Sequence, residues 1–256
     1  MQDPTTLKVV TLNLAHGRKD SWHQALLRRT TIQANLDEVV RILGQEQPDV
    51  VALQEADAPS LWSGRFHHIA YLSEKTGIPY FLLGSHVRRM KLAYGTALIS
   101  RHPLKETTSH RFSPSPPTQR KGMVVGTIRW PGRPHFSLDV VSVHLDFSRK
   151  SVRQRQAREA IQRLADRRRP LVLMGDFNCG FSKRDGTLSM LAHDLGLQAY
   201  EPQATDMASF PLRNKRFDWI MISAEFVFLT HRTLPDVLSD HRAVVATLGL
   251  ARPQAT

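Results

Sequence analysis

The chain has 256 residues, which is enough for one large domain or two small ones with a sizeable core. It has no run of eighteen or more apolar residues that would span a membrane, and its single cysteine, Cys179, excludes an intrachain disulfide. Lysine and arginine outnumber aspartate and glutamate by 35 to 23, which gives a net charge of +12. Such an excess favours a polyanionic partner: nucleic acid, an anionic lipid surface or a phosphorylated substrate.

Residues 1–6 lack the basic start and apolar core of a secretory signal. We therefore expect a cytoplasmic protein, although a secreted chain whose signal had been trimmed would look the same. A lone cysteine agrees with a reducing compartment.

Apolar runs of strand length recur along the chain and are rich in valine, isoleucine and leucine. They lie at residues 8–14, 50–54, 80–83, 96–100, 123–129, 138–145, 171–174, 219–222 and 243–248. Many are continuous rather than alternating, as expected of strands that are covered on both faces. Residues 105–121 contain a proline-rich stretch and are predicted to be a surface loop.

Three helices are predicted among these strands. The first ends near Gly44 and shows the i, i+3, i+4, i+7 spacing of an amphipathic helix at Leu36, Val39, Val40 and Leu43. The second covers residues 151–167 and the third covers residues 187–195. Strands interleaved with helices indicate an α/β (α+β) fold with layered mixed sheets. We expect one domain over residues 1–256, and a monomer.

Polar residues stand at the ends of several predicted strands. Five of them follow a strand, where open α/β sheets place their ligands: Asn13, Glu55, His144, Asp176 and Asn178. Asp218 and the pair Asp240-His241 instead precede their strands. If those two strands run antiparallel to the others, all of these residues meet in one cleft. Carboxylates, an amide and imidazoles in one cleft suit metal-assisted attack on a phosphate ester.

Single members of this set have simpler explanations. Asp218 alone is typical of a turn residue, and His144 alone of a partly buried histidine with a backbone partner. Six short motifs in this order nevertheless resemble the endonuclease/exonuclease/phosphatase superfamily and span nearly the whole chain. They are Leu12-Asn13, Leu53-Gln54-Glu55, Val143-His144-Leu145, Gly175-Asp176-Phe177-Asn178, Phe217-Asp218-Trp219-Ile220 and Ser239-Asp240-His241.

The resemblance implies a four-layer αββα sandwich, in which two packed mixed β-sheets are flanked by helices. It also implies a hydrolase of phosphoric ester bonds that depends on a divalent metal. Glu55 would be the main metal carboxylate, with Asn13 beside it and Asp240 completing the oxygen shell. A sparse oxygen site suits Mg²⁺, and Mn²⁺ could substitute for it.

The other motif residues would carry the chemistry. Asp176 would orient or deprotonate the attacking water. His241, held by Asp218, would steady the charge of the transition state or share the proton transfer. Asn178 and His144 would hydrogen-bond to the non-bridging phosphate oxygens.

Two departures from the family pattern bear on which branch of the superfamily the chain resembles. Ala15 stands where apurinic endonucleases carry an acidic residue, and Phe217-Asp218-Trp219 replaces the Trp-Cys-Asp-Arg element of the 5-phosphatases. The chain is most similar to small bacterial members of the superfamily.

Basic residues near the motifs are candidates for binding substrate phosphate. Arg149 and Arg153 lie at the start of the helix that follows His144, and Arg120 and Lys121 follow the proline-rich stretch. Further basic clusters at residues 88–91 and 213–216 are plausible contacts to a phosphate backbone, whereas the later arginines of the helix fit an ordinary solvated face.

The charge favours nucleic acid as the substrate, cut as an endonuclease or an exonuclease. The same residues would serve a phosphodiesterase or phosphatase that acts on a phospholipid head group, as a sphingomyelinase does, or on a small phosphorylated metabolite. A third alternative is a non-catalytic binding protein on the same fold. Such a protein would be expected to have lost a core motif residue, and none is lost.

Overall fold

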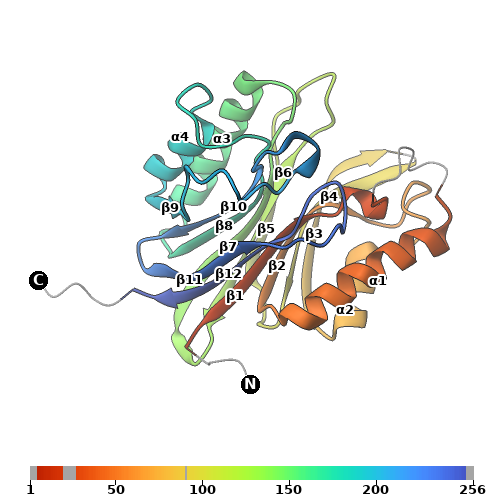
Figure 1. Cartoon of the computed structure of the whole chain (residues 1–256), viewed down its shortest axis with the longest axis horizontal. Helices are drawn as coiled ribbons and strands as arrows, with labels where there is room; N and C mark the ends of the chain where they lie inside the picture. The colour runs from red at the N-terminus through yellow and green to blue at the C-terminus, as the bar shows by residue number, and fades with distance from the viewer. Residues whose placement is uncertain (1–4, 20–26, 90, 252–256) are drawn as a thin grey trace, which may run out of the picture.

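The computed structural model describes residues 5–19, 27–89 and 91–251. Two six-stranded β-sheets pack face to face, with helices on their outer sides (Figure 1). The first sheet has the order β11-β12-β1-β2-β4-β3 and the second has the order β5-β6-β7-β8-β10-β9. Both sheets are mixed, because β1 with β2 and β7 with β8 are parallel pairs and the other pairs are antiparallel. The predicted four-layer sandwich is confirmed.

The first sheet contains β1 (Leu7–Asn13), β2 (Val50–Asp57), β3 (Tyr80–Arg89), β4 (Leu92–Ser100), β11 (Phe226–Thr233) and β12 (Val244–Leu250). The second contains β5 (Lys105–Arg111), β6 (Gly122–Trp130), β7 (Arg133–His144), β8 (Leu171–Asp176), β9 (Leu197–Ala199) and β10 (Asp218–Ser223). The helices are α1 (Arg29–Glu46), α2 (His68–Thr76), α3 (Lys150–Ala165) and α4 (Thr187–Asp194), with short 3₁₀ turns η1 (Ala15–Gly17) and η3 (Pro211–Arg213). No helix in the described ranges is both long and apolar enough to cross a membrane.

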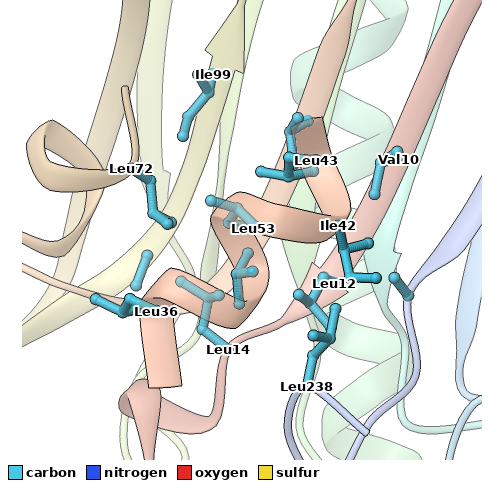
Figure 2. Packing of buried hydrophobic residues seen from close by; sticks show 14 of the residues in the cluster. Val10, Leu12, Leu14, Leu36, Ile42, Leu43, Leu53, Leu72, Ile99 and Leu238 are labelled. Atoms are coloured by element: carbon cyan, nitrogen blue, oxygen red, sulfur yellow. The ribbon is translucent and has the colours of Figure 1, made fainter. Parts of the chain in front are cut away.

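Three apolar clusters separate the four layers. One lies between α1, α2 and the first sheet, a second between the two sheets, and a third between the second sheet and α3 and α4. Figure 2 shows the first cluster, with side chains of α1 against those of β1 and β2: Leu36, Ile42, Leu43, Val10, Leu12 and Leu53. Each such fully buried side chain contributes roughly 1.5–3 kcal/mol relative to its exposed state.

The buried strands have one face in each cluster, which explains their continuous apolar runs. On β1, Val9 faces the inter-sheet cluster while Val10 and Leu12 face the helices. On β7, Val140 faces the inter-sheet cluster while Val141 faces α3. The period of two is therefore present, but both faces of each strand are apolar.

The loop prediction for residues 105–121 is wrong at its start, because residues 105–111 form β5. The strands that the sequence patterns did not predict, β5, β9 and β11, are all at or beside a sheet edge, where half of the backbone groups and many side chains face water. The sequence patterns also did not predict helix α2. His68 and Ser73 are polar but occupy buried positions on its inner face, so the apolar spacing is broken.

Candidate active site

The inter-sheet core ends in polar side chains at one edge of the sandwich. On β7 and β8 the inward-facing series passes from apolar residues to His144 and Asp176, which are direct cross-strand neighbours. Asp218, the first residue of β10, lies opposite Asp176 in the antiparallel pair. Asn13 ends β1, and Ser142 and Gln54 fill the space below with a hydrogen bond of 3.1 Å. The site is thus the open mouth between the two sheets.

Glu55 reaches this mouth through a β-bulge. Gln54 pairs with Thr96 and Ala56 pairs with Gly95, so Glu55 is an extra residue in β2, with φ at 49°. A bulge re-aims one side chain without ending the strand, and here it turns the Glu55 carboxylate to the cleft. Strand β2 accordingly continues to Asp57, beyond the predicted end.

The turn before β12 brings in Asp240 and His241. Strand β12 runs antiparallel to β1, so the residues before it lie next to the end of β1. The Ser239 hydroxyl donates to the Asn13 carbonyl at 2.6 Å and accepts from the His241 amide at 2.9 Å. These two bonds fix the turn over the mouth.

Seven of the eight predicted catalytic and metal-binding residues, all except Asp218, line one cleft of about 290 Å³. Its lining consists of Asn13, Arg18, Glu55, Lys121, His144, Phe147, Asp176, Asn178, Phe210, Arg213, Phe217, Asp240 and His241. Asp218 lies directly beneath, fully buried, with its carboxylate on His241. The structure therefore brings the eight residues together, as the antiparallel arrangement required.

Asp176 is the centre of the hydrogen-bond network. One carboxylate oxygen accepts from the Asn13 amide at 3.0 Å, and the other accepts from the Asn178 backbone at 2.9 Å. Burial raises the pKa of Asp176 to about 7; His241 opposes this shift and the Asp218 carboxylate adds to it. A carboxylate with a pKa near neutrality suits proton transfer at neutral pH.

His241 and Asp218 form a tight pair. The Nδ1 atom of His241 lies 2.7 Å from the Asp218 carboxylate, and its Nε2 atom faces Asp176 at 3.8 Å. Burial alone would lower the pKa of His241, but the carboxylates of Asp218 and Asp176 raise it to about 10. His241 is therefore a cation at neutral pH, with Nε2–H available to the cleft.

Glu55 and Asp240 supply carboxylate oxygens suited to a divalent cation. Burial would raise the pKa of Glu55, but the positive charges of His16, Lys121 and His241 hold it well below its usual range, so Glu55 is ionised. Ionised oxygen ligands at an open cleft match the preference of Mg²⁺ for few carboxylates plus water and phosphate. Asp176, Asp218 and His241 also lie close enough to hold an ion in principle. Asp218 and His241, however, are already hydrogen-bonded to each other at 2.7 Å. Glu55 and Asp240 are therefore the better candidates to hold the ion.

Asn13 has a different environment from the one expected of a metal ligand. Its amide nitrogen donates to Asp176, and its amide oxygen accepts from the Ala15 backbone at 3.0 Å. Both ends of the amide are thus used to orient Asp176 and the turn after β1. We therefore assign Asn13 the role of a hydrogen-bond donor to Asp176.

The predicted phosphate-binding residues separate into two groups. Lys121 lines the cleft, with Nζ 3.0 Å from His144 Nε2 and 3.6 Å from Glu55. Arg153 does not reach the cleft, because it is buried and paired with Asp185 at 2.6 Å. Arg149 donates to backbone carbonyls of the neighbouring loop. Arg149 and Arg153 therefore do not line the cleft, because sequence proximity did not show where the guanidinium groups point.

Two other predicted residues behave differently. Arg120 lines an adjoining cavity rather than the cleft. Asn178, in contrast, sits in the cleft with φ at 53°, and its amide donates to the Leu145 carbonyl at 3.1 Å.

Sequence patterns missed a second layer of residues behind Glu55. His16 lies 3.4 Å from Glu55 through Nε2 and 2.9 Å from the fully buried Asp57 through Nδ1. Asp57 comes two residues after Glu55, and the short Glu–Ala–Asp spacing was the available signal. The backbone is also strained here, because Ala15, His16 and Glu55 are non-glycine residues with φ of 43°, 60° and 49°.

Arg18 is a further residue that the sequence did not indicate. Its guanidinium pairs with Asp240 at 2.9 Å, and both side chains line the cleft. Burial raises the pKa of Asp240, an effect that His241 and Arg18 oppose.

Comparisons with known proteins agree with this geometry. The sequence model of the Endonuclease/Exonuclease/phosphatase family matches residues 10–241, so the chain belongs to this family. Its members are hydrolytic phosphoesterases that depend on a divalent metal. A comparison with curated proteins returned no match.

Three solved structures illustrate the similarity of fold. The endonuclease/exonuclease/phosphatase from Beutenbergia cavernae is 20% identical with a TM-score of 0.73, and the match covers 96% of this chain and 72% of that one. The family member from Bacteroides vulgatus is 16% identical with a TM-score of 0.74, covering 96% and 100%. The human nocturnin catalytic domain, solved with a bound sulfate anion, is 17% identical with a TM-score of 0.71, covering 98% and 96%.

Proposed function

We propose that this protein is a divalent-metal-dependent phosphodiesterase that hydrolyses nucleic acid. The observation that carries the proposal is the arrangement around Asp176. A buried carboxylate with a pKa of about 7 faces a histidine cation held by Asp218, in a cleft that also presents Glu55 and Asp240.

Asp176 accepts the proton of the attacking water. The Asn13 amide and the Asn178 backbone hold its two oxygens in place, so the carboxylate is oriented before substrate arrives. The water oxygen bonds to phosphorus, and the opposite ester P–O bond breaks with its electron pair going to the leaving ester oxygen, which takes up a proton from solvent. His241 donates its Nε2–H to the charge that develops on phosphate, and Asp218 keeps the imidazole charged and oriented.

Other donors at the cleft wall hold the non-bridging oxygens. Lys121 brings a positive charge to within 3.6 Å of Glu55. Burial and the charge of Lys121 lower the pKa of His144, so that His144 is neutral. A divalent cation held by Glu55 and Asp240 would supply further neutralisation of phosphate charge. Mg²⁺ suits this oxygen set, and Mn²⁺ could replace it.

The charge of the molecule supports nucleic acid as the substrate. The net charge of +12 attracts a polyanion, and Arg18, Lys121 and Arg213 stand at the cleft itself. An aromatic ring is also available for stacking on a base, because Phe147 lines the cleft and is 63% exposed.

The same rim supports a second candidate, a phosphodiesterase acting on a phospholipid head group. Phe147 and Leu212 are exposed by 63% and 79%, and Leu212 lies between the cleft residues Phe210 and Arg213. Exposed apolar side chains beside basic residues are also found where proteins insert side chains into a lipid interface.

One experiment separates these functions. The protein is incubated with Mg²⁺ or with excess chelator, and offered end-labelled single-stranded DNA, duplex DNA, abasic duplex, RNA and sphingomyelin vesicles. We expect Mg²⁺-dependent cleavage of at least one nucleic acid, with no release of head group. Head-group release without strand cleavage would support the second candidate. Undiminished activity in chelator would refute metal dependence.

A further inference from the structure

A row of cross-strand neighbours connects the active site to a basic pocket. Arg111 on β5 pairs with Gly122, Gly122 pairs with His144, and His144 pairs with Asp176. Arg111 is therefore three strand spacings from Asp176, or about 14 Å along the same edge of the sheet. Both positions are at the mouth between the sheets, since β3 of the first sheet faces β5 and β6 of the second.

Four arginines from three segments meet around this part of the mouth. Arg88 and Arg89 end β3, Arg111 ends β5, and Arg120 belongs to the loop between β5 and β6. All four line one cavity of about 360 Å³, in which Ser115, Thr118 and Gln119 provide further polar groups. Arg120 and the cleft residue Lys121 are consecutive, so the cavity and the active-site cleft adjoin.

These guanidinium groups have no acidic partner in the described part of the chain, in contrast to Arg153, which is paired with Asp185. Two acids lie close by without forming an ion pair with these arginines. Glu159 lines an adjoining cavity together with Arg111 and Arg120, where it accepts from the Ser113 backbone and faces His110. Asp146 accepts from Ser148 and Thr118. Like charges gathered without counter-ions repel one another, and an anion in the pocket relieves that repulsion.

The loop that lines the cavity at Ser115 and Pro116 is held in place by hydrogen bonds. Arg149 donates to the carbonyls of Ser115 and Pro116 at 2.9 and 2.7 Å, and this explains its absence from the cleft. The loop that carries Arg149 also carries Phe147, whose exposed ring lines the cleft. An aromatic ring beside arginines is the combination that single-stranded nucleic acid meets in many binding grooves.

We propose that Arg88, Arg89, Arg111 and Arg120 bind the phosphate backbone of a nucleic-acid strand whose scissile phosphate lies in the cleft. A strand with an axial rise of about 3.4 Å per nucleotide covers ~14 Å in about four nucleotides. The inference rests on the proposed function and narrows it to a polymeric substrate. A lipid surface fits the pocket less well, because its exposed apolar side chains are two prolines, Pro114 and Pro116.

The test compares two variants of equal net charge. Arg88→Gln with Arg111→Gln removes two pocket arginines. Arg129→Gln with Arg133→Gln removes two exposed arginines from the far ends of β6 and β7, and serves as the control. The rate constant kcat/KM is measured for a single-stranded 20-mer and for a dinucleotide over 50–200 mM salt. Binding of the 20-mer and of phosphatidylserine vesicles is measured by fluorescence anisotropy and sedimentation.

We expect the pocket variant to lose about tenfold in kcat/KM and in affinity for the 20-mer, with a salt slope smaller by about 1.4. Its activity on the dinucleotide should stay within about twofold of wild type, and the control variant should match wild type on both substrates. Equal effects of the two variants on the 20-mer would overturn the proposal. So would an equal loss on the dinucleotide, or a loss confined to vesicles. Wild-type protein that cleaves neither substrate would instead refute the proposed function, while 20-mer binding would still report on the pocket.

Discussion

The carboxylates on either side of His241 are both buried but have different tasks. Asp218 touches the imidazole Nδ1 at 2.7 Å and stands outside the cleft, so it can act on substrate through His241 alone. Asp176 lines the cleft and is held by Asn13 and Asn178. The two environments thus give Asp218 a positioning role and Asp176 a proton-accepting role.

Asp218→Asn tests the positioning role. The variant removes the charge that keeps His241 protonated, so we expect kcat to fall by about 10²-fold or more with the fold intact. In a His241→Ala background the same substitution should add little, because the two residues act as a unit. Steady-state kinetics of the two single variants and the double variant measure this, and independent, additive losses would contradict the pairing.

Asp57→Asn tests the residues behind Glu55. Asp57 holds His16, and His16 in turn faces Glu55, so the substitution should loosen the carboxylate that we assign to the metal. We expect about tenfold weaker Mg²⁺ binding, in line with other outer partners of metal ligands. Isothermal titration calorimetry with Mg²⁺ measures this affinity directly. Asp166→Asn, an exposed residue at the end of α3, is the control, and equal affinities in the two variants would contradict the role of Asp57.

At the scale of elements, the strand before Asp176 depends on a glycine. Gly175 has φ at +151°, and a Cβ atom there would lie 1.9 Å from the Val143 carbonyl oxygen. Gly175→Ala should therefore cost roughly 3 kcal/mol or more of unfolding free energy, because two strands must separate. Gly44→Ala in α1, where a Cβ meets open space, should stabilise by about 0.5–1 kcal/mol. Thermal melting of both proteins checks the contrast, and similar melting temperatures would contradict it.

The end of β3 carries a buried histidine that makes stability depend on pH. His86 donates to or accepts from Thr96 Oγ1 at 2.8 Å, and burial lowers its pKa to about 3, with Lys121 and Arg111 acting in the same direction. The unfolded chain has an ordinary histidine pKa near 6.5. Above that pH neither state is protonated at His86. As pH falls from about 6.5 towards 3, the unfolded state takes up a proton first, so stability is lost.

His86→Gln should therefore flatten the pH dependence of stability by up to about 1.4 kcal/mol per pH unit in this window. Urea unfolding of wild type and variant at pH 7, 5.5 and 4.5 measures it. Parallel curves for the two proteins would contradict the assignment. A residual slope is expected from His231, whose pKa burial and Arg216 also lower to about 3.

At the scale of the whole molecule, the sequence was sufficient for the layers and for the gathering of the motif residues. Continuous apolar runs on both faces predict covered sheets, and the position of polar residues at run ends predicts one polar mouth. Edge strands and α2 could not be predicted, because β5 is almost entirely polar and buried polar side chains interrupt α2.

The parts of the site that sequence patterns missed depend on side-chain direction. Arg149 and Arg153 are near the motif in the chain, yet their guanidinium groups turn to the loop and to Asp185. Arg111 is distant from Arg88 in sequence, yet the two line one cavity once the sheets pack. Spacing along the chain gives the ends of strands but not the register between sheets.

Single-turnover kinetics test directly whether Asp176 accepts the water proton in a metal-dependent phosphodiesterase. Single-turnover cleavage of an end-labelled oligonucleotide is followed in Mg²⁺ for wild type, Asp176→Asn and the exposed control Asp166→Asn. We expect the rate of Asp176→Asn to fall by about 10²–10⁴-fold with the folded state retained, and the control to match wild type. A wild-type rate in folded Asp176→Asn would contradict the role of Asp176 as the proton acceptor.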